Sequence, residues 1–167
     1  MTLAEAAVQA AALAEEGSER ELATLRQQWA EELEMAARSA DYRERAVAYR
    51  AIGQFRFRQK LELLRRGLED ESPACRGSAL VSLELLSREG PSPVNAMRAL
   101  LHHLATADAN QAVRRLAILC LKNGSPQRDT IVLLAGLGDD DRQEQDLRAT
   151  AARVSALLKK RAGPTGR

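Results

Sequence analysis

The side chains that most often do chemistry are scarce in this sequence of 167 residues. His102 and His103 are its only histidines, and Cys75 and Cys120 are its only cysteines. Two histidines on a helix share a metal ion when they lie three or four positions apart, whereas adjacent residues point about 100° apart. We therefore expect no metal, no cofactor and no catalytic residues. The two cysteines fit small buried thiols of a reducing compartment, so we expect a cytoplasmic protein.

Charged side chains offer a second kind of chemistry, and they are unevenly distributed. Residues 42–66 hold eight basic and two acidic residues, whereas residues 1–41 hold three basic and nine acidic ones. Two interpretations stay open: the basic segment pairs with the acidic N-terminal residues, or it meets an acidic protein or the phosphates of a nucleic acid. The sequence FRFR at residues 55–58 lies in this segment, and alternating aromatic and arginine side chains can stack on bases.

Helices must position these residues. Ala and Leu supply most of the apolar residues and only 3% of the chain is aromatic, which favours helices over strands. We expect N-caps at Thr2, Ser18, Asp41 and Asn110, and helix starts at the Ser-Pro pairs 72–73, 92–93 and 125–126. Glycines, Gly53 among them, are expected to stop helices. These signals predict no membrane span and nine helices, with the spans 2–16, 18–38, 41–54, 57–69, 73–88, 93–106, 110–122, 126–137 and 143–161.

A repeat organises these helices. Four arginines, spaced 31, 38 and 34 residues apart, are each followed three positions later by alanine. A period in this range with two helices per unit is typical of an α-solenoid, and the alanines let a neighbouring helix approach closely. Phe55 aligns with Leu86 of the next copy, so we expect its ring in the core. The anchor arginines are Arg45, Arg76, Arg114 and Arg148, and the alanines are Ala48, Ala79, Ala117 and Ala151.

The repeat resembles the HEAT repeat family, in particular its compact HEAT-like variants. The resemblance rests on an aspartate near the turn, an arginine and an alanine-rich second helix, as in DESPACRGSALVSLELL and DANQAVRRLAILCL. It implies an all-α, right-handed α-solenoid of about four helical hairpins over residues 39–161. Residues 1–38 would form acidic capping helices, and residues 162–167 a disordered tail. It also implies that the anchor arginines bond a turn aspartate or a carbonyl of their own or the next repeat.

In such solenoids the second helices line a concave surface that binds partners. On that face the middle repeats are apolar and the flanking repeats bring arginine, which fits a helix or an extended segment of another protein. Alternatively, the protein's own helices cover the apolar residues. The partner-binding residues that we expect are Arg43, Arg50, Arg56, Arg58, Val81, Leu85, Arg115, Leu119 and Arg153.

The resemblance favours a non-catalytic scaffold, adaptor or chaperone-like module that binds another protein and no membrane. One alternative is binding of nucleic acid through residues 43–66, as in HEAT-like proteins of the alkyl-purine glycosylase type. Another is a subunit of a HEAT-like lyase that attaches chromophores. No nucleophile motif or phosphate loop supports an enzyme.

Overall fold

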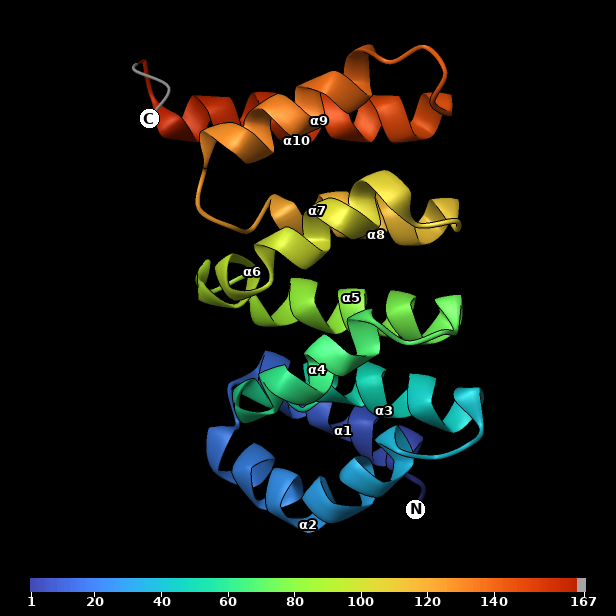
Figure 1. The fold of residues 1–167 in the computed structure, drawn as a ribbon. Coiled ribbons are helices and arrows are strands. Elements are labelled where there is room, and N and C mark those ends of the chain that lie inside the picture. Colours follow the sequence, from blue (N-terminus) through green and yellow to red (C-terminus); the bar gives the residue numbers. More distant parts are fainter. Residues whose placement is uncertain (165–167) are drawn as a thin grey trace. The chain divides into compact units, whose positions relative to one another are not determined.

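The computed structural model describes residues 1–164, which form α-helices, one 3₁₀ helix and no strand (Figure 1). The all-α prediction is therefore confirmed. The elements are α1 (Leu3–Glu16), α2 (Glu19–Ala37), α3 (Tyr42–Gln54), the 3₁₀ helix η1 (Arg58–Lys60), α4 (Leu61–Leu68), α5 (Pro73–Leu86), α6 (Ser92–Ala96), α7 (Arg98–Ala107), α8 (Gln111–Leu121), α9 (Arg128–Asp139) and α10 (Gln145–Ala162). Residues 165–167 of the predicted tail lie outside the described residues.

Three predicted N-caps hold their helices. Thr2 and Glu5 form a reciprocal capping box, with hydrogen bonds of 2.7 and 3.2 Å. The Asp41 carboxylate accepts from the backbone N–H of Arg43 at 2.9 Å, and the Asn110 amide oxygen accepts from the N–H of Val113 at 3.0 Å. Each cap satisfies a donor that the helix itself cannot use.

One predicted cap bond is absent, and one predicted helix start is wrong. The side chain of Ser18 makes no cap hydrogen bond, although α2 begins directly after it. Helix α9 begins at Arg128 rather than at residue 126. The N–H of Ser125 donates to Asn95 Oδ1 at 2.9 Å and its carbonyl accepts from Arg98 at 3.0 Å, which holds this turn outside the helix.

Two predicted helices are interrupted. The span 93–106 is broken at Met97, where the backbone N–H bonds to the carbonyl three residues earlier instead of four, so α6 and α7 are separate. The span 57–69 divides into η1 and α4. Neither break coincides with an internal glycine or proline, so the sequence gives no signal for it.

The chain divides into two compact units, Met1–Leu86 and a second unit from Ser87 onward. In the first unit α2 pairs with α3 and α4 pairs with α5, α3 packs on α5, and α1 packs on α2 and α3. Helix α2, which falls within the predicted capping segment 1–38, is thus the first helix of a hairpin. All aromatic residues of the chain lie in this unit, namely Trp29, Tyr42, Tyr49, Phe55 and Phe57.

Small residues allow the helices of the first unit to approach closely. Helix α3 ends at Gln54, where the predicted span 41–54 also ends, but Gly53 lies inside the helix and is not the residue that caps it. A Cβ on Gly53 would lie 2.7 Å from the Cα of Ser82 in α5, and a Cβ on Gly67 would lie 2.9 Å from the Cβ of Ala79. The alanine column Ala48, Ala79, Ala117 and Ala151 is fully buried, as predicted.

In the second unit α7 pairs with α8, α9 pairs with α10, and α8 packs on α10. Its core is aliphatic, with Leu101, Ile118 and Leu134 fully buried. Arg98 is also buried, and its guanidinium donates to the hydroxyl of Thr130 at 2.8 Å and to the carbonyl of Ser125. These bonds tie the start of α7 to the first turn of α9 and to the loop before it.

Candidate protein-interaction groove

An apolar groove lies where α1, α2 and α3 meet in the first unit. Its first part is a hollow of about 590 Å³. Thr2, Leu3 and Ala4 line it from the start of α1, Glu32, Met35 and Ala36 from α2, and Arg43, Glu44 and Val47 from α3. The second part is a hollow of about 320 Å³, lined by Ala4, Val8, Ala46, Val47, Arg50, Gln54 and Ser78. Both hollows are lined by Ala4 and Val47, so they adjoin one another, and together we name them the α1–α3 groove.

Large apolar side chains in this groove are open to solvent. Val8, Met35 and Val47 expose 64, 66 and 39% of their surface. On α1 the core takes Leu3, Ala6, Ala7 and Ala10, so Val8 faces away from it. Clustered exposed apolar side chains mark interaction surfaces, whereas single ones are ordinary. The α1–α3 groove therefore fits a protein ligand.

The charged groups around the groove differ in how they are satisfied. The guanidinium of Arg43 pairs with Asp41, the N-cap of its own helix, at 3.1 Å. The hydrogen bonds from Arg43 hold the pKa of the Asp41 carboxyl below its ordinary value. The Glu44 carboxylate accepts from the hydroxyl of Ser39. Across residues 1–164 neither Arg50 nor Glu32 has a side-chain partner, and both are exposed.

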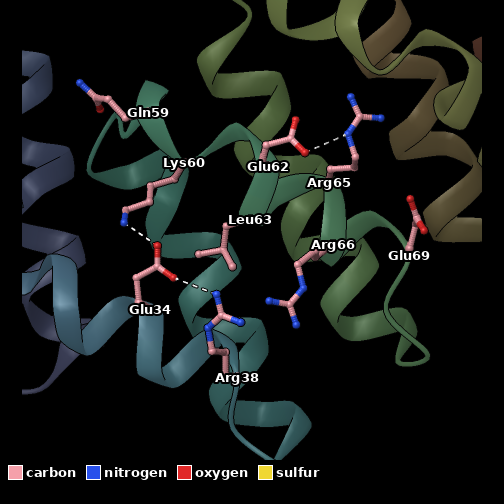
Figure 2. Close-up of a pocket in the computed structure, with 9 residues that line it drawn as sticks. All are labelled: Glu34, Arg38, Gln59, Lys60, Glu62, Leu63, Arg65, Arg66 and Glu69. Carbon is pink, nitrogen blue, oxygen red and sulfur yellow. Dashed lines mark hydrogen bonds and ion pairs between the residues drawn. The ribbon is translucent and has the colours of Figure 1, made fainter.

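A second, charged cleft of about 360 Å³ lies between α2 and the η1–α4 segment (Figure 2). Figure 2 shows Glu34 between Lys60 and Arg38, with one carboxylate oxygen bonded to Lys60 and the other 3.6 Å from Arg38. The hydrogen bond from Lys60 lowers the pKa of Glu34, and the charges of Lys60 and Arg38 add to this. Arg65 pairs with Glu62 at 3.6 Å. Acidic and basic side chains of the cleft therefore pair with one another. The bond between Lys60 and Glu34 joins the basic segment 42–66 to the acidic residues 1–41.

The predicted partner-binding residues are divided between the two units. In the first unit Arg43 and Arg50 line the α1–α3 groove, Arg58 is exposed at η1, and Val81 and Leu85 are half-buried on α5. In the second unit Arg115 and Leu119 are half-buried on α8, and Arg153 is exposed on α10. The prediction missed Val8, Met35 and Val47, whose solvent exposure depends on how the helices pack.

Arg56, one of the predicted partner-binding residues, lies in the turn that ends α3. Its φ of 55° is left-handed, and the next N–H, that of Phe57, donates to the carbonyl of Ile52 at 3.0 Å. This geometry ends a helix and is usually taken by glycine. The guanidinium of Arg56 turns back to the carbonyl of Gly53 at 2.7 Å. Arg56 therefore caps the C-terminus of α3.

The four anchor arginines donate to backbone carbonyls that precede them in the chain. Arg45 bonds Ser39 at 3.0 Å and Arg76 bonds Asp70 at 2.9 Å. Arg114 bonds Ala105 at 2.9 Å and Arg148 bonds Gly138 at 3.3 Å. Arg45 also donates to the carboxylate of Asp70, in the turn between α4 and α5. Arg114 donates to the amide oxygen of Gln143, in the turn between α9 and α10. These bonds join each second helix to the chain before it.

The rings of the FRFR segment point into the protein. Phe55 is fully buried and Phe57 exposes 6% of its surface, with ring centroids 5.6 Å apart. The core prediction for Phe55 is confirmed, and neither ring can stack on a base. Cys75 and Cys120 are buried free thiols, also as predicted.

The histidines differ in their surroundings. His102 Nε2 lies 2.8 Å from the hydroxyl of Thr130, and His103 is exposed. Residues 1–164 contain no group of three or more His, Cys, Asp or Glu side chains placed to hold a metal ion. In the same part of the chain, no helix is both long enough and apolar enough to cross a membrane.

Hairpins whose second helices stack on one another define the α-solenoid class of proteins. A family model described as HEAT repeats matches residues 30–103, which run from within α2 into α7. These residues are HEAT repeats, so the resemblance is confirmed for the part of the chain that holds the anchors Arg45 and Arg76. A search of curated proteins finds no match. HEAT repeats generally serve as scaffolds for protein interactions.

Proposed function

We propose that this protein is a non-catalytic scaffold or adaptor that binds a segment of another protein in the α1–α3 groove. One observation carries the proposal: the exposed side chains of Val8, Met35 and Val47 line two adjoining hollows on α1, α2 and α3. Burying three such side chains against a partner contributes several kcal/mol, at about 1.5–3 kcal/mol for each fully buried one. The reduced, buried thiols fit a site of action in the cytoplasm.

We assign the binding site to the α1–α3 groove and not to the basic segment 42–66. Within that segment Arg43, Arg45, Arg56 and Lys60 bond to groups of the protein itself, and both Phe rings are buried. Binding of phosphates would have to compete with these contacts. Binding of an apolar segment in the α1–α3 groove would break none of them.

The test is a pull-down from nuclease-treated lysate of the native organism with three baits. Val47→Glu places a charge in the groove, and Val132→Glu places the same charge at an exposed valine of α9 in the second unit. We expect one stoichiometric protein on the wild type and on Val132→Glu, and its loss on Val47→Glu. Circular dichroism confirms that both variants are folded.

Two results would overturn the proposal. A partner retained equally by Val47→Glu does not bind in the groove. Binding that disappears when nuclease is added, and weakens when Arg58 is changed to Glu, would assign the function to nucleic acid instead.

A further inference from the structure

The two ends of the α1–α3 groove carry opposite charges. Glu32 lines only the first hollow and Arg50 only the second, with the shared residues Ala4 and Val47 between them. Both charged side chains are exposed and have no partner within residues 1–164. By contrast, Arg43 and Glu44 already bond to Asp41 and Ser39. The groove therefore offers an unmatched negative charge at one end and an unmatched positive charge at the other.

The walls of the groove favour a helix as its occupant. They are formed by α1, α2 and α3, with Ser78 of α5 at one end, so the groove has no strand edge with which an extended peptide could pair. Ala4, Ala36 and Ala46 are small and let a helix approach. Exposed Met35 is flexible and polarisable, which suits packing against varied apolar side chains.

We propose that the groove binds an amphipathic helix of a partner protein, with its acidic N-terminal end beside Arg50 and its basic C-terminal end beside Glu32. The direction follows from the helix dipole, which favours acidic residues in the first turn of a helix and basic residues in the last. The apolar stripe of such a helix lies over Ala4 and Val47. This inference rests on the proposed function and adds to it the secondary structure, the charge order and the direction of the partner segment.

The probes are peptides selected on the wild-type protein from a display library of random sequences about 20 residues long. Only peptides whose affinity falls with Val47→Glu are kept, because these bind in the groove. We expect an apolar stripe with helical spacing, Asp or Glu near the N-terminus and Lys or Arg near the C-terminus.

Fluorescence anisotropy then tests the charge order. Arg50→Glu is expected to lower the affinity for a peptide with an N-terminal acidic residue about fivefold. A peptide with Lys in place of that residue should regain affinity for this variant. The matched control is Arg20→Glu, an exposed arginine of α2 that lines neither hollow. It should leave the affinity unchanged.

Disulfide trapping tests the direction. A peptide with an N-terminal cysteine should cross-link to Gln54→Cys at the Arg50 end and not to Glu32→Cys, and a C-terminal cysteine should give the reverse. Peptides sensitive to Val47→Glu that bind Arg50→Glu as tightly as the wild type, or that cross-link in the opposite direction, would overturn this inference but not the proposed function. A library that yields no peptide sensitive to Val47→Glu would overturn both.

Discussion

The backbone N–H of Gly53 in α3 donates a hydrogen bond to the Oγ of Ser82 in α5, 2.9 Å away. The Ser82 hydroxyl donates in turn to the carbonyl of Tyr49, so one side chain links two backbone groups of the neighbouring helix. This contact requires that residue 53 has no Cβ. Helices α3 and α5 are therefore held at a spacing that a single methyl group would disturb.

Replacing Gly53 by Ala should destabilise the first unit by about 1–3 kcal/mol, because the new Cβ would overlap the backbone of Ser82. Denaturant unfolding followed by far-ultraviolet circular dichroism, which reports the helices of both units, measures the change. Gly90→Ala is the matched control, since no atom lies within 4 Å of a Cβ at that position. Equal midpoints for Gly53→Ala and the wild type would contradict the close-contact explanation.

Ala79, one turn before Ser82 on α5, is subject to the same restriction. It is fully buried and faces Gly67 of α4, so Ala79→Leu should cost about 1–3 kcal/mol through overpacking. Ala74→Leu, at an exposed position of the same helix, should have little effect on the unfolding midpoint. If the two variants unfold alike, close approach at the alanine column is not what stabilises the stack.

The ion pair between Arg45 and Asp70 links adjacent repeats of the first unit. Two nitrogens of Arg45 donate to the Asp70 carboxylate at 2.9 and 3.0 Å, and the side chains expose only 14 and 8% of their surface. Asp70→Asn leaves a guanidinium without its anion and should cost about 2–3 kcal/mol at pH 7. Asp141→Asn, at an exposed aspartate, provides the control in the same unfolding assay.

Acid should weaken the same ion pair. Burial raises the pKa of Asp70, but the hydrogen bonds from Arg45 and from the N–H of Ser72 outweigh it, and the net pKa is lowered. A carboxyl with a lowered folded pKa contributes stability above its unfolded pKa of about 3.9, and this contribution is lost as the pH falls through the folded value. Wild-type stability should therefore drop below about pH 4 more steeply than that of Asp70→Asn. Parallel curves would contradict this assignment.

His102 should make the second unit sensitive to mild acid. Burial lowers its pKa; Asp129 opposes the shift and Arg98 adds to it. A histidine with a lowered folded pKa binds its proton more readily when unfolded, so stability falls as the pH drops through about 6.5. Unfolding followed by circular dichroism at pH 7.5 and 5.5 should show a smaller loss of stability for His102→Gln than for the wild type. His103→Gln, at an exposed position, should behave like the wild type.

Much of the fold could be predicted because its signals are local. The caps at Thr2, Asp41 and Asn110 act within one helical turn, and each lies where the sequence indicated. The start of α9 could not be placed in this way, because Asn95 and Arg98, about 30 residues earlier, fix the backbone of Ser125. Tertiary contacts there outweigh the local preference of a Ser-Pro pair.

The groove could be predicted only in part. Arg50 was found because it faces away from the core stripe of α3. Val8 and Met35 were missed because α1 and α2 carry more apolar residues than one buried face requires, and periodicity does not say which of them stay exposed. That distinction requires the packing of α1 against α2 and α3.

The confinement of every aromatic side chain to residues 29–57 has a practical consequence for spectroscopy. Intrinsic fluorescence and absorbance at 280 nm report only the first unit, whereas far-ultraviolet circular dichroism reports the helices of both. If the two units unfold at different denaturant concentrations, the optical transitions will separate without any added label. Tryptophans introduced at Leu100 or Leu133 would make the second unit visible.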